Sequence, residues 1–147
     1  MMILKKRKVL FLCTGNSARS QMAEGLLRWH GGRYFDAFSA GLEPKGINPY
    51  TIRVMQEIGY EMESHRSKNL SEYLGEHFSY LITVCNHADE KCPVFPGMGQ
   101  RLHWGFEDPA TFAGTDEEIL AKFREIRNQI DNTILAWMSS QGLQAYS

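Results

Sequence analysis

The chain has 147 residues, so we expect a single domain over residues 1–147. Its 16 Lys and Arg residues nearly balance its 17 Asp and Glu residues, which argues against a nucleic-acid-binding protein, since that class needs a basic face. Three cysteines are too few for a disulfide-built secreted fold, and no apolar run is long enough to span a membrane. We therefore expect a cytoplasmic protein with no membrane partner, whose thiols are catalytic, redox-active or metal-binding.

The first half of the chain predicts two successive strand–helix units. An apolar run predicts a buried strand over 8–13, and a helical pattern follows over 17–30. Residues 35–40 predict a second strand. Asn48-Pro49 starts the next helix, because proline is favoured at the first helical position, and Gly59 ends it.

The second half predicts two more strands and a long final helix. Residues 64–77 predict a short helix with loops, and 80–84 a buried strand. Two prolines and two glycines predict a loop over 86–100, followed by a fourth strand over 101–106. Thr115 and Glu118 have capping-box spacing, which predicts the start of an amphipathic helix ending near Ser140. Strands that alternate with helices favour a parallel α/β sandwich.

Chemically active residues follow three of the predicted strands. Cys13, Cys85 and the pair Glu107-Asp108 each lie just beyond a strand end. Ligands of such folds bind at the carboxyl ends of the strands. We therefore expect these residues to share one site.

The segment that begins at Cys13 predicts a cradle for a tetrahedral oxyanion. Backbone N–H groups of a tight loop and of a helix N-terminus can point at the anion, and the Arg19 guanidinium can hold two of its oxygens. The same positive field favours the thiolate of Cys13, which makes it a nucleophile rather than a buried structural thiol. The predicted anion-binding loop consists of Thr14, Gly15, Asn16, Ser17, Ala18, Arg19 and Ser20.

We expect individual residues to support the anion-binding loop or the reaction. Gly15 allows close backbone approach to a ligand. Asn16 and Ser17 can brace the loop, although Ser17 is equally suited to be only a helix N-cap. Ser20 is near enough to hydrogen-bond to the Cys13 thiolate. Asp108 is our candidate for the acid that protonates a leaving oxygen, with Glu107 as its rival and a plain Asp-Pro turn as the structural alternative.

Cys85 and Cys92 leave two interpretations open. In a redox relay, Cys85 attacks an adduct on Cys13 and Cys92 then takes over the disulfide by exchange. A zinc site would use Cys85, His87 and Cys92, but it would need a fourth ligand and lacks the usual short spacing between cysteines.

The pattern resembles the low-molecular-weight protein tyrosine phosphatases. The residues that carry the resemblance are Cys13-x₅-Arg19-Ser20 after a first strand and Asp108-Pro109 late in the chain. More specifically, it is similar to the thioredoxin-coupled arsenate reductases of that superfamily, which add two cysteines six residues apart before a Trp-Gly-Phe-acid-Asp-Pro stretch; here these are Cys85, Cys92 and 104–109. The phosphatases carry a tyrosine pair after Asp-Pro, where this chain has Ala110-Thr111-Phe112.

The resemblance implies a flavodoxin-like three-layer sandwich, with a four-stranded parallel sheet and helices on both faces. It also implies arsenate as substrate, no cofactor, a monomer, and thioredoxin, with glutaredoxin as the alternative, as the partner that reduces a final Cys85–Cys92 disulfide. Phosphotyrosine or small phosphoester hydrolysis is the runner-up activity, and a zinc-stabilised or redox-sensing binding module is the third.

Some reductases of this type bind potassium beside the loop. Asn16, Glu24 and Ser39 match parts of that site. Lys68 stands where an acidic residue is expected, so we predict no metal here.

Overall fold

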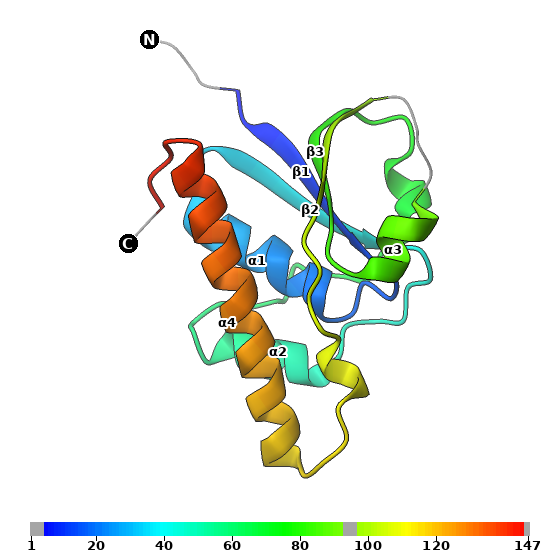
Figure 1. The fold of residues 1–147 in the computed structure, drawn as a ribbon, viewed down its shortest axis with the longest axis vertical. Helices are drawn as coiled ribbons and strands as arrows, with labels where there is room; N and C mark the ends of the chain where they lie inside the picture. The colour runs from blue at the N-terminus through cyan, green and yellow to red at the C-terminus, as the bar shows by residue number, and fades with distance from the viewer. Residues whose placement is uncertain (1–4, 93–96, 146–147) are drawn as a thin grey trace.

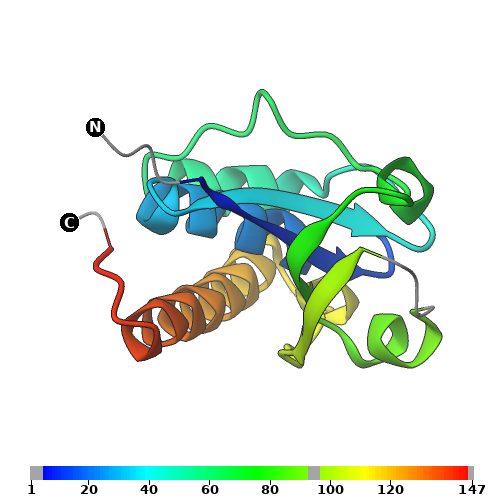
Figure 2. The same ribbon diagram turned by 90° about the horizontal axis from the view of Figure 1, so that it is seen from above.

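The centre of the molecule is a sheet of four parallel strands in the order β2-β1-β3-β4 (Figures 1 and 2). The computed structural model describes residues 5–92 and 97–145. The strands are β1 (Arg7–Cys13), β2 (Phe35–Gly41), β3 (Phe78–Thr83) and β4 (Met98–His103). This confirms the predicted parallel α/β architecture with four strands.

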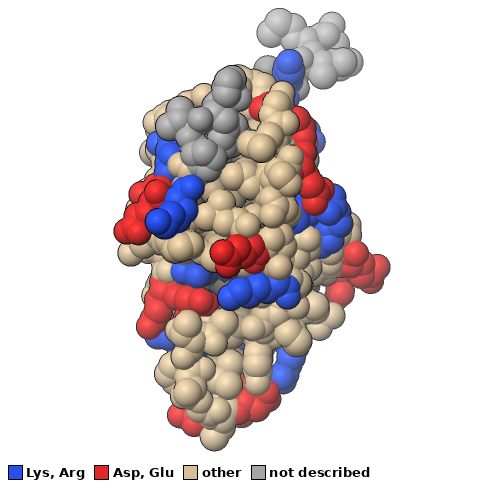
Figure 3. All heavy atoms as spheres, turned by 90° about the vertical axis from the view of Figure 1, so that its right-hand side faces the viewer, with Lys and Arg blue, Asp and Glu red and all other residues tan. Residues whose placement is uncertain are grey.

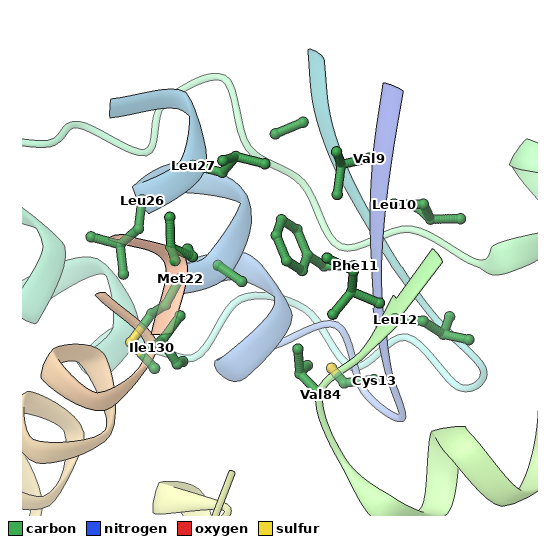
Figure 4. Close-up of a cluster of buried hydrophobic side chains, with 14 of the residues drawn as sticks. Val9, Leu10, Phe11, Leu12, Cys13, Met22, Leu26, Leu27, Val84 and Ile130 are labelled. Carbon is green, nitrogen blue, oxygen red and sulfur yellow. The ribbon is translucent and has the colours of Figure 1, made fainter. Parts of the chain in front are cut away.

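Strand β1 is central because its apolar run is covered on both faces. Successive side chains of a strand point to opposite faces. Phe11 accordingly points toward α1 (Arg19–Gly31), whereas Leu10 and Leu12 point to the other side of the sheet (Figure 4). All three side chains are fully buried, as expected for a strand of a parallel sheet. Burial of this kind stabilises a fold by roughly 1.5–3 kcal/mol for each large apolar side chain.

Helices cover both faces of the sheet and make three layers. On one face, α1 packs with α2 (Pro49–Gln56) and α4 (Asp116–Ser140). On the other face lie α3 (Asn86–Lys91) and the short 3₁₀ helix η1 (Leu70–Tyr73) (Figure 1). Two β2 side chains that point to opposite faces of the sheet show this arrangement. The Phe35 ring stacks on Trp137 of α4 with ring centroids 5.1 Å apart, and the Phe38 ring contacts Tyr73 of η1 with centroids 5.7 Å apart. The flavodoxin-like three-layer sandwich is thus confirmed.

Helix ends agree with the sequence where side-chain caps exist. Asn48 caps α2 by accepting a hydrogen bond from the Tyr50 amide at 2.9 Å, and Pro49 is the first helical residue. Thr115 and Glu118 form the predicted capping box at the start of α4. That helix buries one stripe of apolar residues, namely Leu120, Phe123, Ile126, Ile130, Ile134 and Met138.

Several boundaries differ from the predictions. Helix α1 begins at Arg19 rather than at residue 17, with Ala18 at its N-cap position, because residues 14–18 are held in the loop, so Ser17 is not the cap. The segment predicted as a loop over 86–100 contains α3, and β4 runs over 98–103 instead of 101–106. The part of that loop at 93–96, including Pro93, lies outside the described residues. The strand predicted over 80–84 is β3, which begins two residues earlier.

Charges are mixed on the face that carries α3, where acidic and basic side chains lie among one another (Figure 3). Within the described ranges, none of the helices is both long and apolar enough to cross a membrane.

Candidate active site

The anion-binding loop connects β1 to α1 and is held from outside by the segment after β2. Carbonyl oxygens of Cys13, Thr14 and Gly15 accept hydrogen bonds from the amides of residues 42, 43 and 45, at 3.2, 2.8 and 2.9 Å. In a trans peptide the N–H points opposite to the C=O. The outward carbonyls therefore turn the next amides toward the inside of the loop, as an anion cradle requires.

Asn16 is the central brace of this loop. It is fully buried and has a φ of 47°, a left-handed conformation that asparagine tolerates better than most residues. Its side-chain amide donates to Ser20 Oγ at 2.8 Å and to Ser39 Oγ at 2.9 Å. Its side-chain oxygen accepts from the Lys68 amide at 2.8 Å. These contacts agree with the bracing role expected from the sequence.

Cys13 is buried at the last position of β1, with its Sγ 2.8 Å from Ser20 Oγ. This is the contact predicted from the sequence. Arg19 begins α1, donates to the Phe106 carbonyl at 3.0 Å and has only 13% of its side chain exposed. A guanidinium held in this way is ready to receive an oxyanion without losing much side-chain entropy.

The two candidate acids have different partners. Asp108 lies 3.5 Å from Arg19 and accepts a hydrogen bond from the Ala110 amide at 3.0 Å, at the start of the 3₁₀ helix η2 (Pro109–Thr111). Glu107 instead forms an ion pair with Lys122 of α4. Asp108 is therefore the acid that shares its surroundings with the loop.

Two adjoining cavities meet at the loop. One, of about 380 Å³, is lined by Cys13 and the loop, and the other, of about 540 Å³, reaches Cys85. Four residues line both cavities: Thr14, Arg19, Lys45 and Asp108. Cys13, Cys85 and Asp108 thus border two adjoining cavities at the carboxyl end of the sheet, where the predicted strand ends placed them together.

Cys85 lies two residues beyond β3 and is the N-cap of α3. Its Sγ is 3.5 Å from Thr14 Oγ1 and accepts a hydrogen bond from the Ala88 amide at 3.4 Å. The first contact ties this sulfur to the anion-binding loop.

Cys92 is the C-cap of the same helix. Its amide donates to the Ala88 carbonyl at 2.9 Å, and its side chain is buried. Burial raises the pKa of the Cys92 thiol, an effect that the Arg101 guanidinium opposes. None of the three cysteines forms a disulfide.

The zinc alternative finds no support in this arrangement. Cys85 and Cys92 lie at opposite ends of α3, and His87 is an exposed residue of its first turn. Over residues 5–92 and 97–145, no group of three His, Cys, Asp or Glu side chains is placed to bind a metal ion.

The residues that match part of a potassium site do come together. Ser39 donates to Glu24 at 2.6 Å, and Asn16 donates to Ser39. The buried Lys68 ammonium lies 3.7 Å from the Glu24 carboxylate. A side chain of the protein therefore places a positive charge beside this carboxylate. Burial lowers the pKa of Lys68, and the Glu24 charge opposes that shift.

Sequence reasoning missed several supports of the loop. Gly41 ends β2 directly beside it: a Cβ there would lie 2.6 Å from the Thr14 carbonyl oxygen. Gln21 is fully buried and donates to Asn16 Oδ1 at 3.0 Å. His65 contacts Gln21 at 2.9 Å from 44 positions further along the chain. The glycine after a strand was a visible signal, but no local pattern marks Gln21 or His65.

Comparisons with known proteins agree with this geometry. The family model of the low molecular weight phosphotyrosine protein phosphatases matches residues 8–146. An arsenate reductase of Halalkalibacterium halodurans is 43% identical over 131 residues, which are 89% of this chain and 94% of that protein.

Solved structures give the same assignment. An arsenate reductase in the phosphate binding state has a TM-score of 0.78 at 27% identity, covering 91% of this chain and 98% of its own. A thioredoxin-dependent arsenate reductase of Corynebacterium glutamicum has a TM-score of 0.61 at 25% identity, covering 92% of this chain and 65% of its own. The chain therefore belongs to the low molecular weight phosphotyrosine protein phosphatase family, among the arsenate reductases of that family.

Proposed function

We propose that this protein reduces arsenate to arsenite, using three cysteines in turn and thioredoxin as the final reductant. The observation that carries the proposal is the position of Cys85. Its thiol touches Thr14 of the anion-binding loop and borders the same cleft as Arg19 and Asp108. A phosphatase needs water at this point, whereas a reductase needs a second thiol.

The first step joins arsenic to sulfur. Arsenate is a tetrahedral oxyanion, so it binds between the loop amides and Arg19. The Cys13 thiolate attacks arsenic, and Asp108 gives its proton to a departing hydroxyl, which leaves as water. No oxidation state changes in this step.

The second step transfers the electrons. The Cys85 thiolate attacks the Cys13 sulfur, and the electron pair of the sulfur–arsenic bond moves to arsenic. Arsenic(V) becomes arsenic(III) and leaves as arsenite, while Cys13 and Cys85 are oxidised to a disulfide. Two thiols thus supply the two electrons that arsenate takes up.

The third step moves the disulfide away from the loop. Cys92 attacks Cys85, Cys13 leaves as a thiolate, and a Cys85–Cys92 disulfide remains. These two residues cap the six-residue helix α3 at its two ends. The seven residue steps between them span about 10 Å in a helix, whereas a disulfide needs Cα atoms within ~7 Å. Helix α3 must therefore unfold, at least in part, before this bond can form.

The two thiols of thioredoxin would then reduce the Cys85–Cys92 disulfide, with glutaredoxin as the alternative reductant. The relative from Corynebacterium glutamicum is thioredoxin-dependent, which supports thioredoxin as the partner here. We further propose that residues 1–147 act as one domain and as a monomer in the cytoplasm, where the three thiols stay reduced.

The test is NADPH consumption with thioredoxin, thioredoxin reductase and arsenate. We expect wild-type protein to turn over repeatedly, and Cys13→Ser, Cys85→Ser and Cys92→Ser each to lose repeated turnover. Normal turnover by Cys85→Ser or Cys92→Ser would show that the relay is wrong.

Hydrolysis of a phosphoester serves as the control for an intact loop and tests the runner-up activity, phosphotyrosine or phosphoester hydrolysis. Cys85→Ser and Cys92→Ser should keep whatever hydrolysis the wild type has, since water replaces the second thiol in that reaction. A wild type that hydrolyses phosphoesters but consumes no NADPH with arsenate would make the protein a phosphatase.

A further inference from the structure

Helix α3 is too short to be stable on its own, so neighbouring residues must keep it folded. It has six residues, and isolated helices of fewer than about 12–15 residues are marginal in water. The only α3 side chain that is fully buried is that of Ala88. Polar contacts from β3 and β4 therefore decide whether α3 is folded.

Arg101 of β4 holds the C-terminal half of α3. Its guanidinium donates to the Asp89 carbonyl oxygen, to the Asp89 carboxylate at 3.3 Å and to the Cys92 carbonyl oxygen at 3.4 Å. Carbonyls of a last helical turn have no partner within the helix, and a cation near them is favourable. We call these contacts between Arg101, Asp89 and Cys92 the Arg101 latch.

Two further residues contact α3: Thr83 shares the Asp89 carboxylate with Arg101, and His103 contacts the N-terminal residue Asn86. Thr83 donates to Asp89 Oδ1 at 3.0 Å and lies 2.8 Å from His103 Nδ1. His103 Nε2 lies 3.0 Å from Asn86 Oδ1. The N-terminal residue Asn86 is thus anchored by His103, whereas the carbonyl oxygens of Asp89 and Cys92 at the other end are bonded by Arg101.

We propose that Arg101 is a positioning residue for the relay: it keeps α3 folded while Cys85 attacks Cys13, and its release sets the rate at which Cys92 reaches Cys85. This inference rests on the proposed function. Opening from the C-terminal end frees Cys92, while Cys85 stays near Thr14 and bonded to Cys13. In the exchange, the Cys92 thiolate forms a bond to the Cys85 sulfur, and Cys13 leaves with the electron pair.

The charge of Arg101 has a second effect that the test must separate. The guanidinium opposes the rise in the pKa of Cys92 that burial causes, so its removal would leave less Cys92 thiolate. Arg101→Lys keeps the charge but loses the fork that bonds several oxygens at once. Arg101→Gln removes both.

The first measurement is hydrogen exchange of backbone amides in the reduced protein, which needs no arsenate. In Arg101→Lys and Arg101→Gln we expect the Cys92 amide to exchange at least 3-fold faster than in wild type. The matched control is Arg53→Gln, which breaks an ion pair with Asp116 on a different part of the surface and should leave α3 unchanged. Unchanged Cys92 exchange in both Arg101 variants would overturn the latch.

The second measurement is a single turnover with arsenate, stopped by alkylation and resolved into Cys13–Cys85 and Cys85–Cys92 disulfides by mass spectrometry. We expect Arg101→Lys to convert the first disulfide to the second at least 3-fold faster than wild type. Faster exchange with an unchanged conversion rate would show that opening of α3 does not limit the relay, and would overturn that part of the proposal. A wild type that forms no disulfide with arsenate would instead refute the proposed function, while the exchange result would still decide the latch.

Discussion

Gly41 shows how one residue without a side chain determines the shape of the loop. A Cβ at this position would lie 2.6 Å from the Thr14 carbonyl oxygen and 2.9 Å from the Asn16 amide nitrogen. Both are backbone atoms, so the clash can be relieved only by moving the loop. We expect Gly41→Ala to lower the free energy of unfolding by about 1–3 kcal/mol, as overpacked sites do.

The same variant should lose activity beyond its loss of stability. A displaced loop no longer aims its amides at the anion, and small misplacements in an active site reduce kcat/KM strongly. Urea unfolding and arsenate-dependent turnover measure the two effects. Gly114→Ala is the control, because a Cβ there meets only side-chain atoms, the nearest at 3.2 Å. If Gly41→Ala matched wild type in both measurements, the loop would not depend on this close approach.

At the residue scale, the sequence predicted contacts between near neighbours and missed those between distant ones. Ser20 follows Cys13 by only seven positions, so their contact could be expected from the sequence, and the structure places the two side chains 2.8 Å apart. Gln21 and His65 belong to the same buried network, but they meet across 44 positions. In the sequence their polar side chains are typical of surface residues, and only the fold shows that they are buried and in contact.

At the scale of elements, the cap at the start of α4 leads to a prediction about stability alone, because it does not contact the candidate active site. Thr115 Oγ1 accepts from the Glu118 amide at 3.2 Å, and Glu118 accepts from the Thr115 amide at 3.1 Å. Thr115→Ala removes the side-chain cap and should cost about 1 kcal/mol of stability, or a Tm decrease of about 2–4 °C. Calorimetry measures this change, and Thr115→Ser, which retains the hydroxyl, should melt close to wild type. An unaltered Tm in Thr115→Ala would mean that the cap adds nothing to α4.

The elements that sequence reasoning misplaced are α3 and β4, and both lack the usual signals. The N-cap of α3 is the Cys85 thiol instead of a Ser, Thr, Asp or Asn side chain. Strand β4 lies at the edge of the sheet and is mostly exposed, so its polar sequence shows no apolar run. Capped helices such as α2 and α4, and the buried strand β1, were predicted well because their local signals agree with their place in the fold.

For the whole molecule, the parallel sheet explains why residues distant in sequence form one site. Cys13 pairs in register with Gly41, and Thr83 of β3 is the neighbour of Leu12. The carboxyl ends of β1, β2 and β3 therefore meet at one edge, where the loop, its support and Cys85 lie side by side. The sequence predicted this convergence from strand ends alone, since it depends only on parallel order.

The buried network behind the loop connects the site to the stability of the whole fold. His65 has a side chain with no exposed surface, and its Nδ1 contacts Gln21 Oε1 at 2.9 Å. The amide nitrogen of Gln21 already donates to Asn16, so its oxygen accepts and the His65 proton is on Nδ1. Tyr60 then donates to Nε2 at 2.7 Å. The neutral form of His65 is thus fully hydrogen-bonded.

This network predicts how stability depends on pH. Burial lowers the pKa of His65 from its ordinary 6.5; the Glu24 charge opposes the shift, and Arg28 and Lys68 add to it. Below about pH 6.5 the unfolded chain therefore binds a proton that the folded protein does not, and the free energy of unfolding decreases as pH falls toward the lower pKa of the folded state. At higher pH both states are neutral at this residue, and the full stability is present.

Urea unfolding at several pH values between 8 and 5 tests this linkage, with His65→Asn as the variant. Asparagine keeps a donor near the position of Nδ1 but does not titrate, so the variant should lose less stability than wild type on acidification. His77→Asn replaces an exposed histidine and should retain the wild-type slope. If wild type and His65→Asn have equal slopes between pH 7 and 5.5, His65 is protonated as easily in the folded protein as in the unfolded chain, and burial does not control it.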